Sequence, residues 1–247
     1  MRDLTAKELL VIHIEIGRPT IDWAFGKQLL DLFFNFDHRL APKTLSVWGE
    51  KVANLSGSED VRPHWAGLGQ MRVNGSLSEF HVGIGWHRKL TTMYHAEIQH
   101  ESQNIRGRLI PAKLSVYAKP HRAIDWRGFT NLLFELTEAQ YGFAHLHRDA
   151  HLRTDLSEAR EPIWITGDRT SKTVPQLGWS TFLGRPYVDI VSPLSDQIQD
   201  VEIAKIGDGY AITLTDSILD VADRYEEFNE IRSKVKTCFP RSFFDIL

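Results

Sequence analysis

The chain has 247 residues and a formal net charge of −3, and it is 42% hydrophobic and 25% charged. These values are typical of an ordinary globular protein and exclude a strong overall attraction to nucleic acid or to an anionic membrane. No stretch approaches the ~20 apolar residues of a membrane span. The one cysteine, Cys238, excludes an internal disulfide and fits a reducing compartment. We therefore expect a cytoplasmic protein without nucleic-acid or membrane contacts.

The first half of the chain predicts a strand, a helix and an antiparallel meander. Apolar residues alternate over Leu10–Ile16, which is typical of a strand. A helix is expected over Thr20–Leu40, with Thr20 as its N-cap and apolar residues three and four positions apart. Three further strands, each with one polar face, are expected over Phe80–Ile84, Met93–Gln99 and Leu114–Ala118.

The second half repeats the order of strand and helix. A helix is expected from Asp125 to about Gln140, then a strand over Phe143–His147. A hairpin over Val201–Thr215 turns at Gly207-Asp208-Gly209, and a last helix covers Val221–Lys236. The sequence predicts an α+β fold, a mostly antiparallel sheet with helices packed on one face. One domain over residues 1–247 is favoured, with two similar strand-helix sub-halves, 1–110 and 111–247, as the alternative.

An apolar stretch at Pro175–Gly184 is expected to organise the core. We interpret it as a core-filling bend or short helical turn in which Trp179 is buried. Ser180 is not predicted to be a nucleophile, because a strained elbow needs Gly-x-Ser-x-Gly and Phe182 occupies the final glycine position. The residues assigned to this packing motif, the Gly178–Gly184 block, are Gly178, Trp179, Thr181, Phe182, Leu183 and Gly184.

A histidine-rich run offers the main enzymatic alternative. His145, His147, Asp149 and His151 are metal-ligand types, and the two first histidines would share one face of a strand. The run resembles the His-x-His-x-Asp-His signature of metallo-β-lactamase-like hydrolases. Ala150 displaces the last ligand, however, and no histidine follows His151. We expect no metal and no cofactor here, and a polar strand end instead; a metal-dependent hydrolase stays the alternative.

Acidic residues concentrate toward the C-terminus. Ten acids lie between Asp196 and Glu230, against Lys205 and Arg224 as the only bases. The cluster is either a solvated helix face or a docking face for a basic partner, whose association such charge would speed. Its residues are Asp216, Asp220, Asp223, Glu226, Glu227 and Glu230.

A weaker basic set is scattered over an earlier part of the chain. We do not interpret it as a nucleic-acid site, because acids lie elsewhere and the aromatic residues are placed for core packing. Its residues are Arg106, Arg108, Lys113, Lys119, Arg122 and Arg127.

The segment Leu177-Gly-Trp-Ser-Thr-Phe-Leu-Gly184, with the hairpin and helix after it, resembles a family of bacterial immunity proteins. These proteins belong to polymorphic-toxin systems and are often associated with type VI secretion effectors. The likeness covers roughly the second half of the chain, and Ser180 stands where an aliphatic residue is common. It implies a non-enzymatic cytoplasmic protein that binds and neutralises a cognate toxin; if that toxin is basic, we expect the acidic cluster to bind it. A structural or adaptor subunit of a bacterial assembly is a further alternative.

Overall fold

The computed structural model describes residues 8–73, 76–90, 92–103, 107–148, 173–195, 197–198 and 200–244. The helices are α1 (Trp23–Asn35), α2 (Trp126–Leu136), α4 (Val188–Val191), α5 (Asp220–Asp223) and α6 (Tyr225–Thr237), with 3-10 turns η1 (Ser58–His64), η2 (Arg185–Tyr187) and η3 (Ser192–Leu194). The strands are β1 (Glu8–Glu15), β2 (Thr44–Val47), β3 (Glu50–Asn54), β4 (Leu68–Val73), β5 (Ser76–His81), β6 (Ile84–Arg88), β7 (Tyr94–Gln99), β8 (Ser102–Gln103), β9 (Leu109–Ile110), β10 (Lys113–Ala118), β11 (Tyr141–Arg148), β12 (Ser180–Leu183), β13 (Glu202–Ile206) and β14 (Gly209–Thr213).

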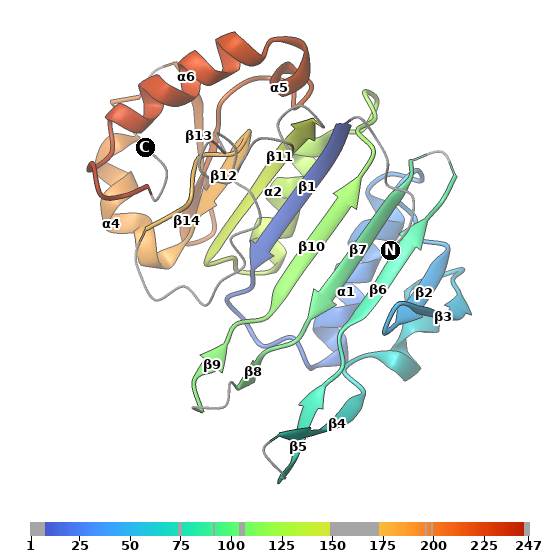
Figure 1. Cartoon of the computed structure of the whole chain (residues 1–247). Coiled ribbons are helices and arrows are strands. Elements are labelled where there is room, and N and C mark those ends of the chain that lie inside the picture. Colours follow the sequence, from blue (N-terminus) through green and yellow to red (C-terminus); the bar gives the residue numbers. More distant parts are fainter. Residues whose placement is uncertain are drawn as a thin grey trace.

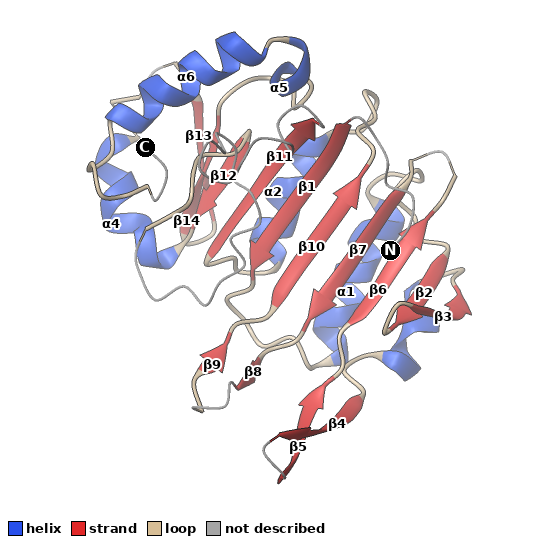
Figure 2. Cartoon of the chain, in the orientation of Figure 1, coloured by secondary structure: helices blue, strands red, loops and turns tan. Residues whose placement is uncertain are grey.

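One ten-stranded sheet runs through the molecule in the order β13-β14-β12-β11-β1-β10-β7-β6-β2-β3, and every pairing in it is antiparallel (Figure 2). This confirms the predicted α+β class and the mostly antiparallel sheet. β4–β5 and β8–β9 are separate two-stranded ribbons at one end of it (Figure 1).

The strand β1 lies at the centre of the sheet. It pairs with β10 on one side, where Ile12 faces Val116, and with β11 on the other, where Ile12 faces Ala144. By sequence β1 belongs to residues 1–110, yet both of its neighbours come from residues 111–247. The two strand-helix segments therefore interlock within a single sheet.

Helices cover both faces of the sheet, but not to the same extent. α1 and α2 lie behind it in Figure 1, and Phe33 of α1 packs at 5.1 Å from the rings of Trp86 and Phe129. On the other face, Phe228 of α6 approaches His145 of β11 at 5.7 Å. Successive side chains of a strand alternate between faces, so α2 over Gly142 and α6 over His145 enclose β11 from both sides.

Most of the predicted elements are confirmed, including β1, β7, β10, β11, α2 with Asp125 as its N-cap, and the hairpin with Gly207 at φ 51°. The first helix, however, begins at Trp23, because the Asp22 carboxylate and not Thr20 caps it, accepting from the Ala24 N–H at 2.9 Å. The hydroxyl of Thr20 instead donates to Glu101 at 2.5 Å.

Two predicted elements are divided in the structure. The expected strand Phe80–Ile84 separates into β5 and β6 around Gly83, where an added Cβ would lie 2.4 Å from the Ile98 carbonyl oxygen. The expected last helix separates into α5 and α6 at Arg224, whose φ of −137° and ψ of 49° are not helical. Local periodicity does not register such breaks, because the apolar stripe continues on both sides of them.

Candidate functional site

The Gly178–Gly184 block forms a strand, not the predicted bend or helical turn. β12 pairs with β11 on one side and β14 on the other, so it lies inside the sheet. Both of its faces are buried, which explains why its sequence, Ser-Thr-Phe-Leu, shows no alternation of apolar and charged residues. The predicted burial of Trp179 is confirmed: it is 1% exposed, and its indole N–H donates to the Thr215 carbonyl at 2.9 Å.

The glycines of the block permit close approach of neighbouring backbone. A Cβ on Gly184 would lie 2.2 Å from the Ala139 carbonyl oxygen, which no real side chain tolerates. Phe182 stacks on Phe134 of α2 at 4.9 Å, with 26° between the ring planes. Ser180 is fully buried, and its Oγ accepts from the Thr213 hydroxyl at 3.2 Å. These residues therefore hold the core together and face no solvent.

The histidines of the alternative hydrolase site lie inside the protein. His145 and His147 share one face of β11 as predicted, with ring centroids 5.0 Å apart, and they are 0% and 1% exposed. The Nδ1 of His145 accepts from the Trp179 backbone N–H at 3.1 Å. Asp149 and His151 lie outside the described residues. Within the described part of the chain, no group of three or more metal-ligating side chains could hold an ion.

The predicted acidic cluster gathers at α5 and the first turns of α6, but several of its carboxylates bind arginines of this chain. Asp220 is 9% exposed and pairs with Arg224 at 3.0 Å, while its Oδ2 also accepts from the Ser217 N–H. Asp223 pairs with Arg122 at 3.3 Å, and both side chains are more than half exposed. Asp220 therefore has a structural role that the sequence does not indicate.

The remaining acids of the cluster face solvent. Glu227 pairs with Arg224 at 3.2 Å, and Asp216 approaches Arg127 at 3.5 Å with a fully exposed side chain. Glu226 and Glu230 are exposed and form no ion pair with any residue that the structure describes. Being four positions apart, they project from the same side of α6. The basic set contributes Arg122 and Arg127 to this region, which neutralises part of the cluster.

The face of β6, β7 and β10 opposite to α1 is polar, as the alternation predicts. His95 stacks on Tyr117 with ring centroids 6.3 Å apart, and its Nε2 lies 3.5 Å from Glu97. Burial lowers the pKa of His87, and its neighbours His95, Lys89 and Lys51 lower it further. These effects favour the neutral form of the His87 imidazole.

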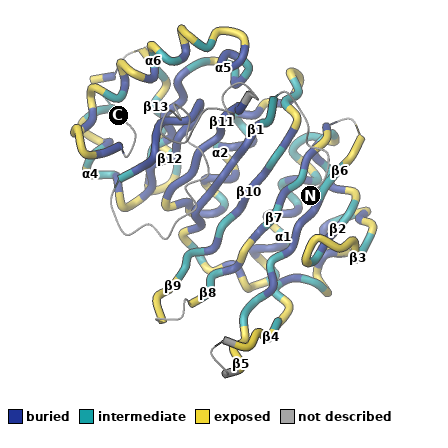
Figure 3. The backbone as a smooth tube through the Cα atoms, viewed as in Figure 1, coloured by how far each residue is buried: buried dark blue, intermediate teal, exposed yellow. Residues whose placement is uncertain are grey.

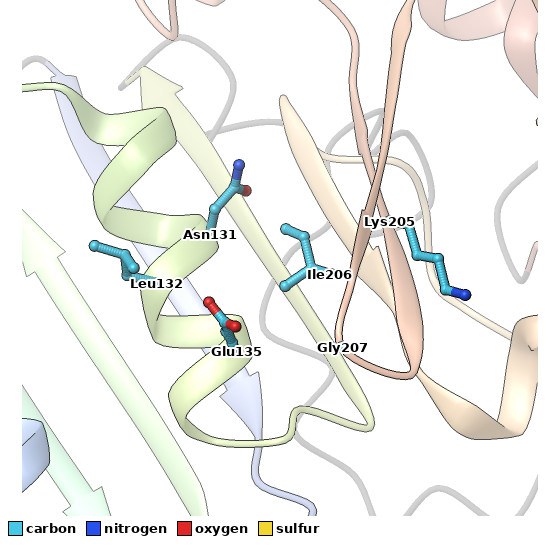
Figure 4. A pocket seen from close by; sticks show the side chains of 6 residues that line it. All are labelled: Asn131, Leu132, Glu135, Lys205, Ile206 and Gly207. Atoms are coloured by element: carbon cyan, nitrogen blue, oxygen red, sulfur yellow. The ribbon is translucent and has the colours of Figure 1, made fainter.

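A cleft of about 170 Å³ lies between α2 and the turn of the β13–β14 hairpin (Figure 4). It is lined by Asn131, Leu132, Glu135, Lys205, Ile206 and Gly207. The sequence analysis does not identify it. Asn131 and Glu135 have the i, i+4 spacing that places them on one side of a helix, but no local pattern shows that β13 lies against that side.

No family model matches this chain, and no curated protein is significantly similar to it. Among the described residues, none of the helices combines the length and the apolar character that crossing a membrane would require.

Proposed function

We propose that this protein is a non-enzymatic immunity protein of the cytoplasm, which binds and neutralises a cognate toxin of basic character. The proposal rests on the resemblance of the Gly178–Gly184 block and the hairpin and helix after it. The observation that carries the choice of partner is the solvent-facing side of α6. There Glu226 and Glu230 are exposed carboxylates without an ion-pair partner among the described residues.

An inhibitor of this kind works by surface complementarity on a rigid scaffold. The C-terminal part of the sheet supplies such a scaffold, because β11 and β12 are packed on both faces. Carboxylates on the rim of an interface mainly raise the association rate with a basic partner and set its salt dependence. An acidic α6 surface on a rigid base fits that role.

The metal-dependent hydrolase alternative receives less support. A catalytic metal needs ligands that open onto a position where substrate or water can bind. His145 and His147 are both buried, and Phe228 of α6 packs over His145. An adaptor subunit of a bacterial assembly would have the same surface, and the identity of the bound partner distinguishes it from an inhibitor.

Co-expression with the product of the neighbouring reading frame tests the proposal. We expect that product to inhibit growth when expressed alone, and to form a stable, inactive complex with this protein. Failure of any neighbouring product to co-purify, or co-purification without loss of toxicity, would contradict it. A metal content near stoichiometric in the purified protein would favour the hydrolase instead.

Charge reversal tests the proposed surface. The double variant Glu226→Lys/Glu230→Lys should slow association by about tenfold at low salt, and the difference should shrink as salt is added. The matched control is Glu50→Lys/Glu79→Lys, which changes the net charge by the same amount at exposed positions of the edge strand β3 and of the separate β4–β5 ribbon. Equal effects of the two double variants would exclude α6 from the interface.

A further inference from the structure

Two imidazoles lie side by side on the open face of the sheet, opposite to α1. His87 of β6 and His95 of β7 face each other directly in the antiparallel register, with ring centroids 6.4 Å apart. An added Cβ on Gly85 would lie 2.8 Å from the His95 ring and 3.1 Å from the Ser46 Oγ, so the glycine leaves room for that ring. Both imidazoles are partly exposed, in contrast to His145. A ligand can therefore reach them from solvent.

Two lysines flank this pair of histidines. Lys89 follows His87 by two positions at the end of β6, and alternate residues of a strand share a face. Lys51 of β3 lies opposite Ser46 in the register of β2 and β3. Both lysines are exposed, and neither forms an ion pair with any residue that the structure describes. We refer to Lys51, His87, Lys89 and His95 together as the basic face.

The charge of this surface is not balanced by carboxylates of the same strands. Glu97 lies 3.5 Å from the Nε2 of His95. The next acid along the chain, Glu101, accepts from the backbone N–H and the hydroxyl of Thr20 and is engaged there. Two lysines and two histidines thus share the surface with one carboxylate. The basic face therefore has the opposite charge to the exposed side of α6.

We propose that the basic face binds an acidic segment of a protein partner, whose carboxylates lie on the two lysines and the two imidazoles. The inference goes beyond the proposed function, because this partner surface has the opposite charge to the one that α6 attracts. Each lysine ammonium has three donors, and a protonated imidazole donates from both nitrogens. Hydrogen bonds between such charged groups and carboxylates are stronger than those between neutral groups.

The composition of the basic face favours an acidic protein segment over a nucleic acid. Proteins that bind nucleic acid neutralise several phosphates and usually have a strongly basic domain. Here the basic groups share their face with Glu97, and the whole chain has a net charge of −3. A segment with a few carboxylates matches this moderate positive charge.

Binding should be coupled to protonation of the imidazoles. In the free protein, burial lowers the pKa of His87, and His95, Lys89 and Lys51 lower it further. A carboxylate placed beside His87 would favour its charged form and oppose these effects. The complex would then bind more protons than the free protein, so affinity should rise as the pH is lowered from 8 to 6. Glu97 is the carboxylate of this chain that lies nearest to the pair, through its contact with His95.

Titration of the full chain with acetylated peptide amides tests this assignment without the toxin. At low salt and pH 6, hexaglutamate should shift the imidazole NMR signals of His87 and His95 in a saturable way. Its affinity should fall several-fold at pH 8 and on addition of salt, and hexaserine and hexalysine should not saturate. Absence of saturable shifts with hexaglutamate, or equal binding of hexaserine, would overturn the proposal. Tighter binding of a single-stranded oligothymidylate would assign the face to nucleic acid and overturn it too.

Variants locate the effect. Lys51→Glu/Lys89→Glu should weaken hexaglutamate binding by about tenfold. The matched control, Lys205→Glu/Arg241→Glu, changes the net charge by the same amount at exposed positions of the C-terminal part, and its effect should stay below about twofold. His87→Gln/His95→Gln should remove most of the pH dependence of binding. An unchanged affinity in the lysine variant, or an unchanged pH dependence in the histidine variant, overturns the site. If co-expression finds no toxin, the proposed function fails, yet the peptide titration still decides the basic face.

Discussion

Two regions of the same sheet differ in how they are covered. At β11 and β12, α2 packs on one face and α6 on the other, so Trp179 and His145 are almost completely buried (Figure 3). At β6 and β7, α1 covers one face only, and His95 on the opposite face keeps about a third of its side chain exposed.

The difference explains why one sheet has two kinds of strand sequence. A strand between two layers needs apolar or small residues at every position, as in the Gly178–Gly184 block. A strand with one solvated face alternates, as β7 does with Tyr94, Ala96 and Ile98 buried and His95 between them. We expect substitutions in the doubly covered region to be far more costly than those in the singly covered region.

The largest expected effect is at Trp179. Trp179→Ala should lower the free energy of unfolding by about 3–5 kcal/mol, because it removes a fully buried indole and its hydrogen bond to Thr215. His95→Ala, on the singly covered region, should cost less than about 1 kcal/mol. Urea denaturation of both variants measures the difference, and similar losses would contradict the comparison.

A smaller but clear effect is expected from overpacking. A methyl group at Gly142 would lie 2.6 Å from the Phe134 ring and 3.0 Å from the His13 carbonyl oxygen, so Gly142→Ala should destabilise the protein by about 1–3 kcal/mol. Gly67 has no atom within 4 Å of an added Cβ, and Gly67→Ala should stay within about 0.5 kcal/mol. An unchanged free energy of unfolding in Gly142→Ala would show that α2 can move away from β11.

Acid should destabilise the protein through His100, at the singly covered end. Burial lowers the pKa of His100 from 6.5 to about 4, with His81 adding to the effect and Glu101 opposing it. Between pH 6.5 and 4 the unfolded chain therefore binds a proton that the folded chain does not. The free energy of unfolding should decrease as the pH is lowered through this range.

One such group contributes at most about 1.4 kcal/mol per pH unit. The dependence is measured by urea denaturation at pH 7, 6 and 5, for the native protein and for His100→Gln. Glutamine retains a hydrogen-bonding group for Thr20, which lies 2.9 Å from the His100 Nδ1, but does not titrate. Identical slopes for the two proteins would remove His100 from the explanation.

The smallest effect is expected on the surface between α5 and the loop before α2. The Arg122 and Asp223 side chains are 81% and 54% exposed, and ion pairs at such positions contribute about 0–1 kcal/mol. Arg122→Ala should therefore change stability by less than 1 kcal/mol, and a double-mutant cycle with Asp223→Ala should give a similarly small coupling energy. A larger coupling energy would mean that this pair is a structural anchor of α5.

Much of the fold could be predicted from periodicity and turn chemistry. The alternation in β1, β7 and β10, the N-cap at Asp125 and the glycine turn at Gly207 are local signals, and each is confirmed. The pattern around β12 does not distinguish a buried strand from a helical turn, because a short run with little alternation fits both. Thr20 does not cap the first helix, because its hydroxyl contacts Glu101 and His100, residues far away in the chain.

The candidate sites depended more on contacts distant in sequence. The acidic cluster was visible as a run of charges, but the burial of Asp220 and the pairing of Asp223 with Arg122 were not. The cleft escaped prediction entirely. In the sequence, Asn131 and Glu135 resemble an ordinary polar helix face. Neither their residue types nor their spacing shows that β13 lies beside them.

The sequence by itself determined most of the strands and helices, β12 excepted, and that the Gly178–Gly184 block belongs to the core. It could do so because hydrophobic periodicity and turn residues act over a few neighbouring positions. Only the tertiary structure decided that β1 lies between strands of the other half, that α6 covers His145, and that the Asn131 Oδ1 atom is buried without a hydrogen-bond partner. Those facts follow from how a ten-stranded sheet brings together residues far apart in the chain, and no local pattern contains them.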